Sequence, residues 1–213
     1  MKEATRDIIL NVSKKLFNEN GYYNVSLRQI ANEIGISQGN LNYHFKKKEE
    51  LLKELYNQFG ETLTKEFVAT SKISANFYLV FELARKTYEI QNEYIFFFND
   101  RLYLANDIPQ LRTQYHHLKV QRIKEFNLMF IGFIEKGDAR AAEYESEYED
   151  LGLRLYLLGI YAMSDLRLEI DLTSQDHLKR YLQIITSAFF PYLTSQGKKK
   201  YFETLQDYDA HIK

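Results

Sequence analysis

The 213-residue chain contains no cysteine and no tryptophan, and it has only 2 prolines and 9 glycines. Without cysteine it can form neither a disulfide scaffold nor a thiolate metal site. Its longest apolar run, residues 155–163, is about half of a membrane span, so we expect no transmembrane helix. The first seven residues are of mixed charge and lack the apolar stretch of a signal peptide, so we expect a soluble, cytoplasmic protein.

The residues that are abundant favour helices. The chain is 45% hydrophobic and 27% charged, with a formal net charge of -1. Many Leu, Lys and Glu residues with few glycines and prolines are typical of helical proteins, and no strand-type alternation stands out. We therefore predict an all-α fold.

The first fifty residues are predicted to contain three helices, of which the last two are short and joined by a tight turn. Ser26 and Gln29 have the spacing of a capping box, and Gly35 is placed to end that helix. Ser37 is a second N-cap, for a helix that runs to about His44. This arrangement is typical of a helix-turn-helix, whose second helix enters the major groove of DNA.

The second helix of this pair carries amide side chains on its polar side. Amides can form paired hydrogen bonds with base edges, and basic groups nearby can bind phosphates, with Lys48 the best placed because it opens the next helix. The alternative is an ordinary helical hairpin beside a solvated charged loop. We expect Phe45 to lie in the core and not to contact DNA. The predicted DNA-contacting residues are Arg28, Ser37, Gln38, Asn40, Asn42, Tyr43, His44 and Lys48.

Several short runs agree in order and spacing, without a gap, with a known family over about residues 6–52. They are Ile8–Leu10, Leu16–Phe17, Gly21–Tyr22, Ile30–Ala31, Gly35–Gly39, Tyr43–Phe45 and Lys48–Leu51. In these runs the chain resembles the tetracycline-repressor family of transcription regulators. The resemblance implies an all-helical homodimer with an N-terminal DNA-binding domain and a C-terminal domain that dimerises and usually binds a small effector. One position departs from the family, which usually has an aromatic residue where this chain has Asn42.

After residue 52 the pattern stays helical. We predict two domains: residues 1–52 as the helix-turn-helix domain and residues 53–213 as a helical effector-binding and dimerisation domain. A capping signal at Thr173 precedes the last long helix. The expected helices are residues 48–70, 110–136 with Pro109 in the first turn, 148–169 and 175–193, with a short helix or frayed tail from Gly197 on.

An apolar stripe at i, i+3, i+4 and i+7 spacing marks the last of these long helices. Gly152 and Gly159 lie seven residues apart on the preceding helix and would allow close approach of another helix. Intramolecular packing is the alternative, but the resemblance favours a dimer face built as a four-helix contact. The stripe consists of Leu178, Tyr181, Leu182, Ile185, Ala188, Phe189 and Tyr192.

Aromatic residues are frequent, 17 Tyr and 15 Phe, and most follow residue 55. They either fill a core or line a cavity for a small apolar or aromatic effector, the usual solution in the family that the chain resembles. The predicted ligand-binding residues are Phe81, Tyr88, Phe98, Tyr103, Phe126 and Phe130.

No pattern of catalytic or metal-ligating residues is present. His116 and His117 are neighbours whose side chains would point about 100° apart on a helix, so they cannot easily chelate one ion. We expect no catalytic residue, metal or cofactor, and no membrane partner. The predicted function is that of a DNA-binding repressor released from its operator by a small effector. The alternatives are an effector-independent, DNA-binding structural protein of the same fold, and an enzyme or small-molecule carrier.

Overall fold

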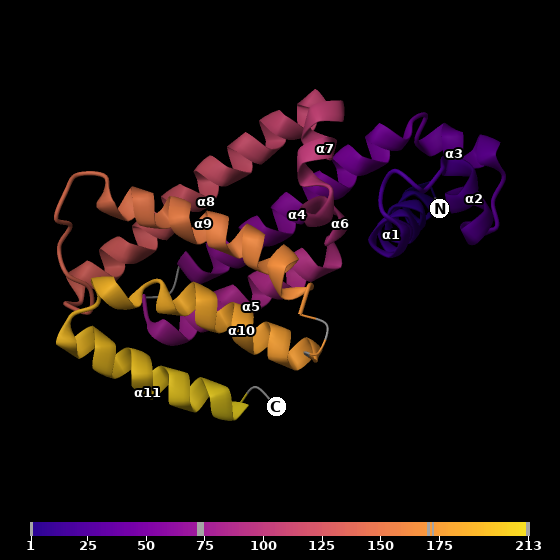
Figure 1. The fold of residues 1–213 in the computed structure, drawn as a ribbon. Helices are drawn as coiled ribbons and strands as arrows, with labels where there is room; N and C mark the ends of the chain where they lie inside the picture. The colour runs from indigo at the N-terminus through magenta and orange to yellow at the C-terminus, as the bar shows by residue number, and fades with distance from the viewer. Residues whose placement is uncertain (1, 72–74, 170, 172, 212–213) are drawn as a thin grey trace. The chain divides into compact units, whose positions relative to one another are not determined.

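The computed structural model describes residues 2–71, 75–169, 171 and 173–211, and helices dominate this part of the chain (Figure 1). The predicted all-α class is confirmed. Within these ranges no helix combines the length and apolarity needed to cross a membrane. The helices are α1 (Lys2–Asn20), α2 (Leu27–Ile34), α3 (Gln38–His44), α4 (Lys48–Ser71), α5 (Phe77–Glu93), α6 (Phe96–Asn99), α7 (Arg101–Asp107), α8 (Pro109–Glu135), α9 (Glu147–Leu166), α10 (Ser174–Ser187), the 3-10 helix η1 (Phe190–Tyr192) and α11 (Ser195–His211).

The chain forms two compact units. The first unit contains residues 1–62 and 90–116, and the second unit contains residues 63–89 and 117–213. The first unit thus joins the N-terminal helices to a later stretch of the chain. The predicted domains, residues 1–52 and 53–213, follow a different division and stay a prediction.

In the first unit, α1 is attached to the segment that leads into α6. The ring of Phe17 is fully buried and lies edge-on to the ring of Phe96, with centroids 5.4 Å apart. The side chain of Asn18 donates to the carbonyl of Glu93 at 2.8 Å and accepts from the backbone N–H of Phe96 at 3.3 Å. These contacts fix the start of α6 against the first helix.

In the second unit, α9 packs on α10, and aromatic rings fill the space between helices. Phe130 of α8 is fully buried and stacks on Tyr148 and Phe189, with ring centroids 5.1 and 4.9 Å away. A Cβ on Gly152 of α9 would meet the carbonyl oxygen of Ile123 at 3.3 Å. Gly152 therefore allows close approach of α9 to α8 within one chain.

The C-terminal part of the fold differs from the predicted one. Residues 175–193 are not one helix, because α10 ends at Ser187 and η1 follows around Pro191, which lacks a backbone donor. The stretch from Gly197 is not a short helix or a frayed tail, since it belongs to the 17-residue α11. Thr194 accepts from the N–H of Gly197 at 3.1 Å and so caps this helix.

The predicted dimer stripe is also corrected by the structure. Leu178 and Ala188 are half-buried, but the other five side chains are buried within a single chain. The spacing was right for an apolar face, yet that face packs inside the second unit. The five buried residues are Tyr181, Leu182, Ile185, Phe189 and Tyr192.

Candidate nucleic-acid interface

The capping box predicted for α2 is confirmed. The hydroxyl of Ser26 accepts from the N–H of Gln29 at 3.2 Å, and the Gln29 side chain accepts from the N–H of Ser26 at 2.7 Å. Gly35 ends the helix with φ +78°, a left-handed conformation that glycine adopts without strain. Both ends of α2 are therefore fixed by the residues that the sequence indicated.

The turn after Gly35 sets the direction of α3. The N–H of Ile36 donates to the carbonyl of Ala31 at 3.0 Å, and the Ser37 hydroxyl accepts from the N–H of Asn40 at 3.1 Å. Leu41 is fully buried and anchors α3 in the first unit, where α2 packs on both α1 and α3. A helix-turn-helix arrangement results, with one side of α3 fixed inward and the other free.

The predicted base-reading residues lie on the free side of α3. Gln38, Asn40 and Asn42 are exposed, and no side-chain hydrogen bond occupies their amides among the described residues. Tyr43 is 66% exposed, and its ring lies edge-on to the half-buried ring of His44, with centroids 5.4 Å apart.

Two other predicted DNA contacts differ in their surroundings. Arg28 of α2 is exposed, as Gln38 is, so its guanidinium is accessible from outside. The hydroxyl of Ser37 accepts the capping bond from Asn40, and its own proton stays available for donation. Ser37 therefore has a structural role as the N-cap of α3.

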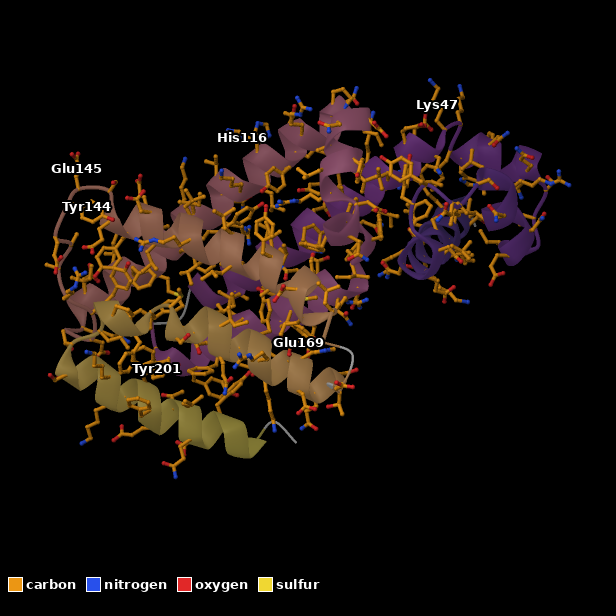
Figure 2. All side chains as sticks on the ribbon, viewed as in Figure 1. Lys47, His116, Tyr144, Glu145, Glu169 and Tyr201 are labelled. Carbon is orange, nitrogen blue, oxygen red and sulfur yellow. The ribbon has the colours of Figure 1, made fainter. Side chains whose placement is uncertain are left out.

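Lys48 is more deeply placed than its neighbours. Its Nζ donates to the carbonyls of Tyr22 at 2.8 Å and Val25 at 2.7 Å and lies 4.2 Å from the centre of the Tyr22 ring. Burial lowers the pKa of Lys48. Lys46 and Lys47 are exposed, and Lys47 points away from the helices (Figure 2). The three lysines thus place positive charge beside α3, two of them with unrestricted side chains.

The six predicted ligand-binding aromatics are divided between the two units. Phe98 and Tyr103 belong to the first unit, and Tyr103 is 70% exposed on α7. In the second unit each predicted ring has its own neighbours: Phe130 lies in the stack described above, and Phe81 lies against Tyr201 and Tyr208. The two remaining predicted rings contact Tyr181, in the case of Tyr88, and Phe67, in the case of Phe126.

A buried ion pair in the second unit was missed by sequence reasoning. Arg122 of α8 is 3% exposed, lies 4.2 Å from the centre of the Phe67 ring, and pairs with Glu125 at 3.0 Å. It also donates to the carbonyl of Leu63 at 3.2 Å and to Thr64 at 2.9 Å. Its position on the apolar stripe of α8, four residues after the buried Leu118, was the available signal.

This ion pair is incompletely satisfied. The Nε of Arg122 is buried without a hydrogen-bond partner among the described residues. Burial lowers the pKa of Arg122 and raises the pKa of Glu125. A buried donor without a partner costs free energy, so a ligand that brought an acceptor to Arg122 would remove that cost.

Comparison with known proteins places both parts of the chain. Residues 9–55 match the family described as bacterial regulatory proteins, tetR family, and residues 58–201 match the one described as bacterial transcriptional repressor. The HTH-type transcriptional regulator QacR of Staphylococcus aureus is 37% identical over 112 residues, which are 49% of this chain and 59% of QacR. The chain thus spans less than two thirds of the length of this curated relative.

Solved structures share the fold. A TetR-family transcriptional regulator from Marinobacter aquaeolei VT8 has a TM-score of 0.84 at 24% identity, covering 96% of this chain and 98% of its own. A putative transcriptional regulator from Saccharomonospora viridis, solved in complex with choline, has a TM-score of 0.71 at 18% identity, covering 88% and 96%. The chain belongs to the tetR family of bacterial regulatory proteins, which are transcription regulators and not enzymes.

Proposed function

We propose that this protein represses transcription by binding operator DNA in the cytoplasm and releases that DNA when a small effector binds. The observation that carries the DNA-binding part is the outward side of α3, where three exposed amides have no side-chain partner among the described residues. Polar groups buried in a folded domain normally form hydrogen bonds within the protein. Exposed amides without such bonds can form them with the edges of bases. Lys46 and Lys47 supply charge for phosphates next to that helix.

A homodimer is part of this proposal. Tyr161 of α9 is 59% exposed and Leu168, just after that helix, is 78% exposed; Leu157 and Leu158 lie on the same side of α9 and are also exposed. An apolar row of this kind on a helix is what a symmetric helix contact covers. Two copies would present two α3 helices to a roughly palindromic operator.

The effector part of the proposal rests on the second unit. The regulator from Saccharomonospora viridis was solved with choline, so a protein of this fold holds a small molecule. We place the effector beside Arg122 and Glu125, where Phe67 and Phe126 supply aromatic surface and the Nε of Arg122 needs an acceptor. The effector would be apolar or aromatic with at least one polar group, and it must bind the DNA-free state more tightly than the DNA-bound state.

An effector-independent DNA-binding protein is the second candidate. It is favoured by the tight packing of two predicted ligand residues, since Phe130 and Phe81 are buried among rings of their own unit. The two candidates agree on α3 and differ only in the second unit.

The test begins with selection of duplexes from a pool randomised over about two helical turns, followed by measurement of Kd on the selected duplex and on a scrambled one of equal composition. We expect the selected duplex to bind roughly 10³-fold or more tightly, as specific regulators do. Equal affinity for both duplexes would contradict operator binding. Loss of binding on addition of a compound that raises Tm would support the effector, whereas failure of every tested amphipathic compound to change either quantity would favour the second candidate.

A further inference from the structure

The outward side of α3 is made of uncharged groups. Leu41 and the following Phe45 are buried and hold the helix from inside, so the remaining positions face outward or sideways. No arginine or lysine occurs within α3, whose residues read QGNLNYH. The exposed residues are Gln38, Gly39, Asn40, Asn42 and Tyr43.

Three asparagines near the helix-turn-helix use their side chains inside the first unit. Asn18 bonds to Glu93 and Phe96, Asn20 donates to the carbonyl of Leu16 at 3.2 Å, and Asn24 donates to the carbonyl of Asn20 at 2.8 Å. The amides of α3 differ from these three, because no side-chain hydrogen bond engages them among the described residues. Their donors and acceptors remain available to a partner outside the chain.

We propose that α3 reads A·T base pairs, with the amides of Gln38, Asn40 and Asn42 forming paired hydrogen bonds to adenines. An amide offers one donor and one acceptor side by side, which matches N7 and the 6-amino group of adenine in the major groove. Guanine presents two acceptors there and is best matched by arginine or lysine, which α3 lacks. This inference rests on the proposed function and adds the kind of base that the same surface recognises.

Gly39 indicates how closely DNA approaches. A Cβ built on this residue would meet only the Ser37 hydroxyl, at 3.9 Å, so the fold itself leaves room for alanine. Glycine is less favourable than alanine within a helix. Because nothing inside the protein requires glycine here, we assign its lack of a side chain to clearance for the DNA that Gln38 and Asn40 contact.

The test uses the full-length protein and duplexes selected from a randomised pool. We expect the enriched half-site to contain adenines whose replacement by 7-deazaadenine, which lacks N7, weakens binding roughly 2- to 12-fold at each contacted position. Replacement of guanines by 7-deazaguanine should leave binding unchanged at the positions that α3 covers. Alanine at position 38, 40 or 42 should abolish the effect of one particular 7-deazaadenine substitution.

Two substitutions in α3 test the same proposal by changing the protein and not the DNA. Gln38→Arg should change one selected base of each half-site from adenine to guanine, whereas Gln206→Arg, at an exposed position of α11, should select the wild-type sequence. Gly39→Ala should raise Tm but weaken binding to the selected duplex. A variant that is both more stable and a poorer binder separates a role in DNA approach from a role in folding.

The contrary results are distinct from failure of the proposed function. A selected site that is sensitive to 7-deazaguanine and insensitive to 7-deazaadenine would overturn this inference while leaving operator binding intact. Selection of no sequence at all would remove the proposed function and this inference together. Stronger binding by Gly39→Ala would overturn the role given to Gly39.

Discussion

Lys48 has a structural role in addition to the phosphate-binding role proposed for it. Its ammonium holds the carbonyls of Tyr22 and Val25, so it ties the start of α4 to the turn before α2. Lys48→Met removes two charge-assisted hydrogen bonds, and we expect the free energy of unfolding to fall by about 2 kcal/mol. Urea unfolding followed by circular dichroism measures this loss, and an unchanged midpoint would contradict the anchoring role.

Lys47 supplies the matched control. It is exposed, so Lys47→Met should leave stability within about 0.5 kcal/mol of the original value. It should weaken binding to selected and scrambled duplexes alike and reduce the slope of log K against log salt by about one, because phosphate contacts are independent of sequence. The phosphate role proposed for Lys48 predicts the same salt effect in Lys48→Met, in addition to the loss of stability.

Arg122 and Glu125 form a largely buried ion pair in the second unit. Arg122→Met leaves the Glu125 carboxylate largely buried without its partner, and we expect a loss of about 3–5 kcal/mol at neutral pH. The double variant Arg122→Met, Glu125→Leu should recover most of that loss, since no charge is then buried. Urea midpoints of the single and double variants give the comparison, and equal loss in both would contradict this account.

The same variant predicts a pH dependence. Burial already raises the pKa of Glu125, and removal of the guanidinium raises it further. The folded state then holds this proton more tightly than the unfolded state, so stability is retained below the raised pKa and lost as the pH rises through it. The loss in free energy of unfolding caused by Arg122→Met should therefore be smaller at acidic pH than at pH 8. A loss of stability that grows on acidification would contradict a raised pKa of Glu125 as its cause.

Helix α11 depends on one glycine. A Cβ on Gly197 would lie 1.9 Å from the carbonyl oxygen of Asp138, whose buried carboxylate accepts from Lys200 at 2.7 Å. Alanine normally stabilises a helix relative to glycine, but here Gly197→Ala should lower stability by about 1–3 kcal/mol because backbone would have to move. Thermal unfolding of Gly197→Ala beside Gly39→Ala should give opposite signs, and a rise in Tm for both would contradict the close contact.

Local signals in the sequence were sufficient for the elements of the DNA-binding part. Ser26, Gln29, Gly35 and Ser37 act through neighbours within a few residues, so their spacing determines where α2 and α3 begin and end. The same holds for the capping box at Thr173, which the structure confirms. Such signals can be recognised in the sequence because the hydrogen bonds of a helix cap do not depend on the rest of the fold.

Contacts between residues far apart in the chain could not be predicted from such local signals. The stripe through Ile185 has the period of a buried face, but periodicity does not say whether that face packs inside the chain or against a second copy. The hydrogen bonds from Arg122 to α4 and the attachment of α1 to the Phe96 segment both need the tertiary structure, since they join residue 122 to residue 63 and residue 18 to residue 96.

The proposed dimer uses the exposed side of α9. Tyr161→Asp places a charge in the middle of the apolar row, and we expect monomers with unchanged helicity because Tyr161 is 59% exposed in the single chain. Phe202→Asp, which changes a similarly exposed ring on α11, should remain dimeric. Light scattering that showed a dimer for Tyr161→Asp would place the interface elsewhere.

Ile185→Asp distinguishes the two readings of the C-terminal helices. Ile185 is buried within one chain, so this substitution should lower Tm and helicity as well as any dimer signal. A folded monomer would instead mean that Ile185 lies at the contact between copies.

Asn40 offers a direct test of whether α3 reads bases. Asn40→Ala should cost about 1–3 kcal/mol of binding free energy on the selected duplex and much less on a scrambled duplex of the same composition, because only the selected sequence offers the amide its paired hydrogen bonds. Fluorescence anisotropy at one fixed salt concentration measures both Kd values with wild type and variant. A loss confined to the selected duplex is the predicted result. Equal losses on the two duplexes, or no loss on either, would contradict base reading by this helix.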